Sequence, residues 1–187
     1  MTVPWLSLVV FLPLLGALLL LFFPATSWEK IRRTALVVTL ADFAFAVPLL
    51  FWFDAGREGM QFLEQHVWIS SPPILYQVGI DGLSLGLVLL TAFLTPIAVL
   101  VSWPITHKVK EFFIMILVLE SGMLGVFVAL DLFLFYVFWE VMLIPMYFLI
   151  GIWGHERRLY ASIKFILFTM LGSLLMLVAI IWLYTAT

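Results

Sequence analysis

The chain has 187 residues and a net charge of −2; 65% of its residues are hydrophobic and only 11% are charged. A soluble domain has roughly 25% charged residues, and the mean hydropathy of +1.23 is strongly apolar, so an ordinary soluble domain is excluded and an all-α integral membrane protein is predicted. Nine Lys and Arg residues provide no basic surface for nucleic acid, and the lack of cysteine excludes disulfides, thiolate zinc sites and iron–sulfur ligands.

Six apolar segments are long enough to cross a bilayer, which takes about 20 residues of helix. In chain order they are Val3–Phe23, Arg33–Phe53, Gly82–Trp103, Phe112–Leu130, Leu132–Trp153 and Tyr160–Tyr184. The first segment lacks the positive flank of a signal peptide, so we interpret it as a retained spanning helix. Asp81 and Asp131 directly precede the third and fifth segments, where an aspartate is a good N-cap.

Residues 54–81 form the one long connection, which is rich in Gly, Pro and charge. We expect a surface loop here, with a short hairpin that includes residues 66–69. Seven of the nine Lys and Arg residues lie in or beside the loops 24–32, 104–111 and 154–159. The positive-inside rule then predicts that these three loops face the cytoplasm, or its organellar equivalent, and that both termini and residues 54–81 face outward.

Four ionisable residues fall inside the predicted spans: Asp42, Glu120, Glu140 and Lys164. Charges at membrane depth are costly and usually face a partner or a water-filled path. Measured from the turn that they share, Glu140 lies about 14 Å along the fifth helix and Glu120 about 15 Å along the fourth. Both carboxyls therefore reach a similar depth, either as a proton relay or as protonated groups that hydrogen-bond a neighbouring helix.

Lys164 lies about 9 Å inside the cytoplasmic edge, where a lysine can take part in a relay or extend to the headgroups. For Asp42 we expect a hydrogen bond to a neighbouring helix, because no cation lies deep in the first two helices. Pro145, five residues beyond Glu140, frees a backbone carbonyl and can bend or hydrate the fifth helix. The three histidines are dispersed among loops, so the sequence predicts no metal site.

Three stretches carry a resemblance to a known family. Residues 80–84 read IDGLS, residues 125–154 contain FWEVMLIPM at 138–146, and residues 160–169 read YASIKFILFT. Together they resemble the antiporter-like, M-type membrane subunits of respiratory complex I, the proton-translocating NADH:quinone oxidoreductase. The resemblance covers the whole chain, weakly in the first two helices and strongly from residue 80 onward.

The resemblance implies about fourteen spanning helices with two inverted five-helix repeats, and a proton half-channel in which Glu140 pairs with a lysine of the seventh helix. Lys164 would lie near that region. Residues 1–110 would be the N-terminal helices, and residues 111–187 the start of the proton-translocating repeat. Because six helices precede the end of the sequence, we expect this to be the N-terminal portion of a longer subunit.

The resemblance also implies that this chain has no cofactor, because NADH, FMN, iron–sulfur clusters and quinone belong to other subunits. Its partners would be the other membrane subunits of the complex, the lipid bilayer, protons and water, in a bacterial inner membrane. Two alternatives remain open: a subunit of a cation/proton antiporter or membrane-bound hydrogenase, and a truncated scaffold that only packs against its neighbours. The close match over residues 125–154 favours complex I.

Overall fold

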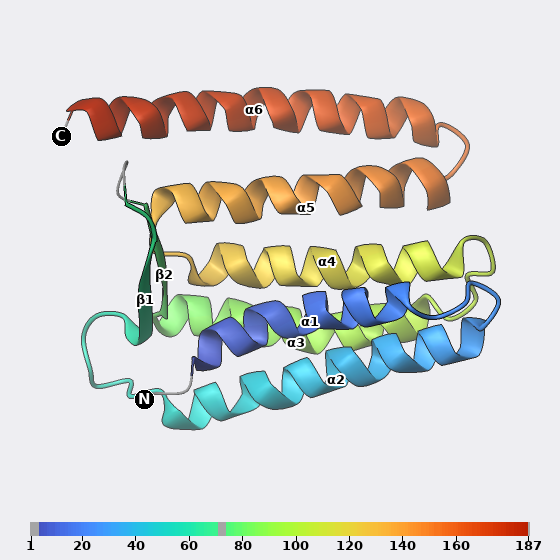
Figure 1. The fold of residues 1–187 in the computed structure, drawn as a ribbon, viewed down its shortest axis with the longest axis horizontal. Helices are drawn as coiled ribbons and strands as arrows, with labels where there is room; N and C mark the ends of the chain where they lie inside the picture. The colour runs from blue at the N-terminus through green and yellow to red at the C-terminus, as the bar shows by residue number, and fades with distance from the viewer. Residues whose placement is uncertain (1–3, 71–73, 187) are drawn as a thin grey trace.

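The computed structural model describes residues 4–70 and 74–186, which form a bundle of six helices with a two-stranded hairpin at one end (Figure 1). The elements are α1 (Trp5–Leu21), α2 (Trp28–Trp52), β1 (Gln61–Ile69), β2 (Ile74–Ile80), α3 (Gly82–Val101), α4 (Val109–Val128), α5 (Leu132–Trp153) and α6 (Arg158–Ala186). The predicted helical membrane architecture is confirmed, and five of these helices are long and apolar enough to span a bilayer. Val3, Pro72, Pro73 and Thr187 lie outside the described residues.

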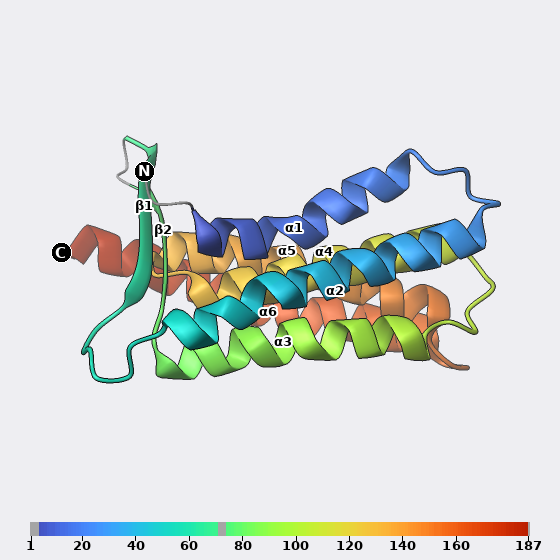
Figure 2. The ribbon, with the colours of Figure 1, turned by 90° about the horizontal axis from the view of Figure 1, so that it is seen from below.

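The helix α4 lies at the centre of the bundle. It packs against α1, α2, α3 and α5, whereas α6 packs against α5 alone among the described elements. Figure 2 shows α1 and α3 at opposite edges, and Figure 1 shows α5 between α4 and α6. One face of α6 is therefore left open, while α2, α3 and α4 enclose a fully buried interior.

Both predicted aspartate caps are present. At the start of α3, Asp81 Oδ1 accepts a hydrogen bond from the Ser84 amide at 2.7 Å, and Ser84 Oγ accepts one from the Asp81 amide at 2.9 Å. The bonds from the Ser84 side chain and backbone hold the pKa of Asp81 below its ordinary value. This carboxylate therefore stabilises the fold at neutral pH, and its contribution is lost as the pH falls through the lowered pKa.

The first two helices have different bounds from those predicted. The helix α1 has 17 residues and ends at Leu21, because the amides of Phe22 and Phe23 close a tighter turn onto Leu19 and Leu20 just before a proline. It is about 26 Å long, shorter than the predicted span. The helix α2 begins at Trp28 rather than at Arg33, because the charged segment before the apolar stretch is itself helical and contains the Glu29–Arg33 ion pair.

The other predicted helices are correct to within three residues at each end, and α5 has the predicted bounds Leu132–Trp153. The helix α4 ends at Val128 rather than at the predicted Leu130. The amide of Leu130 donates instead to the carbonyl of Gln77 at 2.9 Å, and Ala129 forms a bridge with Val78. Residues 129 and 130, which we predicted to end α4, therefore pair with strand β2 of the hairpin instead.

The expected hairpin is present and is longer than residues 66–69. Strands β1 and β2 are antiparallel, with Gln65 opposite Gln77 and His66 opposite Tyr76. An irregularity near Gln61 coincides with a left-handed backbone at Phe62, where φ is 54°. Figure 1 shows the hairpin at the end of the bundle opposite the three short loops, so the cations of those loops lie at the other end.

At the end of the bundle away from the hairpin, cations in and beside the loops bind backbone carbonyls. Lys110 Nζ donates to the carbonyls of Leu21 at 2.7 Å and Phe23 at 2.9 Å, which lie at the C-terminal end of α1. Arg32 donates to the carbonyl of Ile105 at 2.6 Å. Positive groups at a helix C-terminus satisfy its last carbonyls and interact favourably with the helix dipole.

Asp131 connects the start of α5 to the hairpin. Its Oδ1 accepts from the amides of Phe133 at 2.8 Å and Leu134 at 3.0 Å, and its Oδ2 accepts from the amide of Leu75 at 3.3 Å. We expect Asp131→Ala to lower the free energy of unfolding by about 1–2 kcal/mol, as the loss of an N-cap does. Thermal unfolding of the purified protein assembly measures this. Asp131→Asn should keep most of the stability, and an alanine variant as stable as wild type would contradict the assigned cap.

Candidate functional site

Glu140 lies near the middle of α5 and borders a cleft between α5 and α6. The cleft has a volume of about 340 Å³, and its walls are mainly apolar residues of α5 together with Ile166 and Met170 of α6. The Oε1 atom of Glu140 is buried and has no hydrogen-bond partner among the described residues. A buried ionisable side chain in a spanning helix marks Glu140 as a candidate functional residue.

Two hydroxyl groups, those of Tyr136 and Ser173, lie near Glu140. Tyr136, one helical turn before it on α5, interacts through its hydroxyl with Glu140 and with Ser173 of α6. Ser173 is buried. Pro145 lies inside α5 and lacks the amide that would bond the carbonyl of Val141, which also lines the cleft. The site therefore combines one carboxyl, two hydroxyls and one carbonyl freed from the helix ladder.

Lys164 does not meet Glu140 in this structure. The face of α6 toward α5 carries Ser162, which lies close to Gly151, and Ile166. Lys164 is two residues from each of them, which is about 200° around the helix. Its side chain is exposed, and Nζ lies 5.8 Å from the centre of the Tyr160 ring. Lys164 therefore faces away from α5.

Glu120 is also separate from Glu140. The face of α4 toward α5 carries Gly122 and Gly125, which lie against Met142 and Phe138. Glu120 instead points into the interior between α2, α3 and α4, where its carboxyl interacts with Asp42 and lies beside Thr95. The three residues proposed for a relay from the sequence, Glu140, Lys164 and Glu120, thus occupy three different faces of the bundle.

No described residue donates the hydrogen bond that we expect for Asp42. Both of its carboxyl oxygens are buried without a partner in the part of the chain that the structure describes. The nearby Thr39 hydroxyl, on the same helix, donates to the carbonyl of Leu36. The group on a neighbouring helix that interacts with Asp42 is another carboxyl, Glu120 of α4, so a hydrogen bond between the two helices stays a prediction that requires one of the two to hold a proton.

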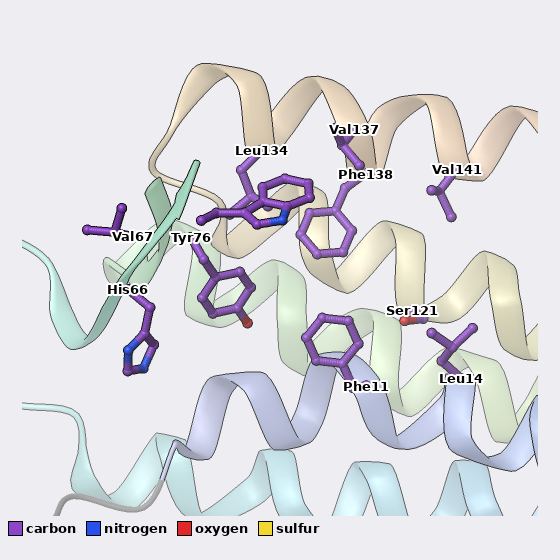
Figure 3. Close-up of a pocket in the computed structure, with 11 residues that line it drawn as sticks. Phe11, Leu14, His66, Val67, Tyr76, Ser121, Leu134, Val137, Phe138 and Val141 are labelled. Atoms are coloured by element: carbon purple, nitrogen blue, oxygen red, sulfur yellow. The ribbon is translucent and has the colours of Figure 1, made fainter. Parts of the chain in front are cut away.

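A second cavity lies between α1, α5 and the hairpin (Figure 3). Its volume is about 540 Å³, and its walls are mostly aliphatic and aromatic, with His66, Tyr76 and Ser121 as polar members. The two valines Val137 and Val141 line both this cavity and the Glu140 cleft. This cavity therefore offers an apolar surface rather than a group that exchanges protons in the membrane.

Residues 129–187 match the sequence family described as "NADH:quinone oxidoreductase/Mrp antiporter, TM". The chain is 46% identical over 183 residues to NADH-quinone oxidoreductase subunit M of Rhodobacter capsulatus, covering 96% of this chain and 35% of the relative. It is also 41% identical to the chloroplastic NAD(P)H-quinone oxidoreductase chain 4 of Chara vulgaris over 94% of this chain and 36% of that relative. The chain thus spans about a third of the length of these two relatives.

Solved structures give the same fold. A chain of respiratory complex I from Thermus thermophilus with bound NADH superposes with a TM-score of 0.79 at 30% identity, covering 93% of this chain and 34% of that one. A chain of the archaeal membrane-bound sulfane sulfur reductase superposes with a TM-score of 0.78 at 20% identity, over 98% of this chain and 28% of that one. The second likeness shows that the fold occurs in another respiratory membrane complex.

Sequence reasoning located Glu140 but missed its neighbours. Tyr136 precedes Glu140 by four residues, and this spacing alone places the two on one helix face. Ser173 and Thr95 could not be found in this way, because their positions depend on how α6 and α3 rotate against α5 and α4. Asp42 was recognised as deep, but its proximity to Glu120 depends on the contact between α2 and α4.

Proposed function

We propose that this chain is part of the membrane arm of a proton-pumping NADH:quinone oxidoreductase, and that Glu140 takes up and releases a proton in a half-channel. The observation that supports this most directly is the buried, unpartnered Oε1 of Glu140 in a cleft of a spanning helix. The 46% identity to an NADH-quinone oxidoreductase subunit supports the assignment to that complex.

The surrounding groups have distinct roles in this proposal. Tyr136 and Ser173 orient the Glu140 carboxyl and offer hydroxyls through which a proton can pass. The carbonyl of Val141, freed by Pro145, can bind a water molecule beside the carboxyl. Lys164, on the open face of α6, is a second relay residue whose partner belongs to another helix of the complex. Residues 111–187 start the translocating unit, and residues 1–110 support it.

The electron-transfer chemistry belongs to other subunits in this proposal. NADH, FMN, iron–sulfur clusters and quinone bind there, and this chain contributes no cofactor ligand. Its partners are the neighbouring membrane subunits, lipid, protons and water. The loops 24–32, 104–111 and 154–159 face the cytoplasm across a bacterial inner membrane, because seven of the nine cations lie in or beside them.

A cation/proton antiporter is the second candidate, because the matching family includes Mrp antiporters by its description. Both candidates use a membrane carboxyl that exchanges a proton. They differ in what drives the exchange: quinone reduction in the first and a cation gradient in the second. Sodium-dependent proton movement that continues without NADH oxidation would favour the antiporter.

The experiment is Glu140→Gln in an assembled complex that contains this chain, with Glu156→Gln as the matched control on an exposed loop. We expect proton pumping and quinone reduction to fall together by about tenfold or more in the first variant, because an amide cannot take up and release a proton. The control should keep both activities. Full pumping by Glu140→Gln would overturn the proposal, and lost assembly with normal turnover per assembled complex would identify a scaffold.

A further inference from the structure

The structure contains a second pair of membrane carboxyls, apart from the Glu140 cleft. Asp42 of α2 and Glu120 of α4 are both fully buried, at 0% exposure, on two helices that pack against each other, and the charge of Asp42 acts on the Glu120 carboxyl. None of their four oxygens has a hydrogen-bond partner among the described residues. We propose that Asp42 and Glu120 form a buried proton-binding site in which the two carboxyls share protons.

The hydroxyls around the pair do not supply the missing donors. Thr95 Oγ1 donates to the carbonyl of Thr91 at 2.9 Å, and Thr91 Oγ1 donates to the carbonyl of Leu87 at 2.9 Å. The hydroxyl of Thr39 is likewise bonded to its own helix. Each of these hydroxyls contains a single hydrogen, so their oxygens can only accept a further bond. Of these hydroxyls, the one of Thr95 also lies against Glu120, and its single hydrogen is already directed to Thr91. Among the described residues, the carboxyls themselves are therefore the main remaining source of hydrogens.

The helix α3 adds an acceptor to this interior and no charge. Pro96 lies inside α3 and lacks the amide that would bond the carbonyl of Ala92, which is buried. A protonated carboxyl can donate to such a carbonyl, whereas a carboxylate cannot. The composition of the interior thus favours the acid form of both side chains over the ionised form.

No cation of the described helices reaches this interior. The helices α1 and α3 contain no charged residue, and the charge within α5 is Glu140, which faces the α5–α6 cleft. On α2, Arg33 pairs with Glu29 and Arg32 donates to Ile105. The two remaining cations and the one remaining acid of the packed helices lie in the first turns of α2 and α4: Lys30, Lys110 and Glu111.

A buried carboxylate pair without a cation or donors is strongly disfavoured, because two like charges repel at close range and each loses its hydration. Binding protons removes both costs, since a neutral acid can donate to the other carboxyl or to an adjacent oxygen. Asp42 and Glu120 therefore retain protons at neutral pH. This site between α2, α3 and α4 is separate from the Glu140 cleft between α5 and α6.

Infrared spectroscopy tests this directly, because a protonated carboxyl has a C=O stretching band separate from that of a carboxylate. The samples are the assembled complex with wild-type chain, Asp42→Asn, Glu120→Gln, and both substitutions together, all at neutral pH. We expect the spectrum of wild type minus the double variant to contain a protonated-carboxyl band. Each single variant should keep one band at a changed position, because its carboxyl then bonds an amide instead of an acid.

Three outcomes would overturn the proposal: no such band, bands that keep their position in both single variants, or a band that disappears on adding sodium chloride. The first means that both groups are ionised, the second that they do not form a pair, and the third that they hold a cation instead. Glu140→Gln is the matched control and should retain the Asp42–Glu120 band. This measurement is independent of pumping, so it distinguishes failure of the pair from failure of the Glu140 proposal.

Discussion

Replacing Gly125 with leucine should prevent α4 and α5 from packing together and strongly reduce the amount of assembled protein. A Cβ atom at Gly125 would lie 2.2 Å from Cδ1 and 2.4 Å from Cγ of Phe138. Real Cβ contacts essentially never come below 3.0 Å. Phe138 is itself buried in a core cluster of the bundle, so a displaced ring would disturb that packing.

The expected cost exceeds about 3 kcal/mol, the upper end of ordinary overpacking, because the clash begins at the first side-chain atom. The amount of this protein in membranes and its thermal stability measure the effect. Gly86→Leu is the matched control, since a Cβ there meets nothing within 4 Å. Phe138→Ala should partly rescue Gly125→Leu by removing the ring. Equal assembly of the Gly125 and Gly86 variants would contradict the observed contact.

The sequence was sufficient to predict the helices because each apolar segment must satisfy its own backbone hydrogen bonds inside a membrane. The hydropathy pattern therefore located all six, and Asp131 marked the start of α5 to the residue. The exact helix ends depend on hydrogen-bond partners from other parts of the chain, which the hydropathy pattern does not reveal. Residues 129 and 130, predicted as the end of α4, pair instead with Gln77 and Val78 of strand β2, which lie some fifty residues earlier in the chain.

The sequence predicted how deep the site residues lie in the membrane but not which neighbouring helix each of them faces. Counting residues from Asp131 placed Glu140 within the fifth span, and the structure has it on the same helix beside α6. The same counting gave Lys164 a suitable depth, yet α6 rotates it away from α5. The depth of a side chain in the membrane follows from the rise per residue of its helix. The direction in which it points depends on how the helices pack, which is set by small residues that allow close approach, such as Ser162 against Gly151. Sequence patterns of uniformly apolar helices contain little of this information.

Replacing Glu64 with alanine should detach the hairpin from the start of α1. Glu64 Oε1 accepts from the Leu6 amide at 2.7 Å, and Oε2 accepts from the Ser7 amide at 3.2 Å and from the Ser7 hydroxyl. The Ser7 hydroxyl also bonds the hydroxyl of Tyr76 at 2.6 Å. Burial raises the pKa of Tyr76, opposed by the Ser7 bond, so its phenol stays neutral and keeps this contact at neutral pH.

We expect Glu64→Ala to lower the stability of this end of the bundle by about 2–3 kcal/mol, because a charged acceptor is lost at a helix N-terminus and leaves two amides without a partner. Hydrogen–deuterium exchange should accelerate in the first turn of α1 and in β1, and trypsin should cut faster at Arg57 in the exposed loop before β1. Glu64→Gln should have a smaller effect, since one acceptor oxygen remains. Glu58→Ala removes an exposed acid from the same loop and should change neither measurement. If Glu58→Ala and Glu64→Ala accelerate exchange equally, the general loss of negative charge is responsible, and Glu64 does not anchor α1.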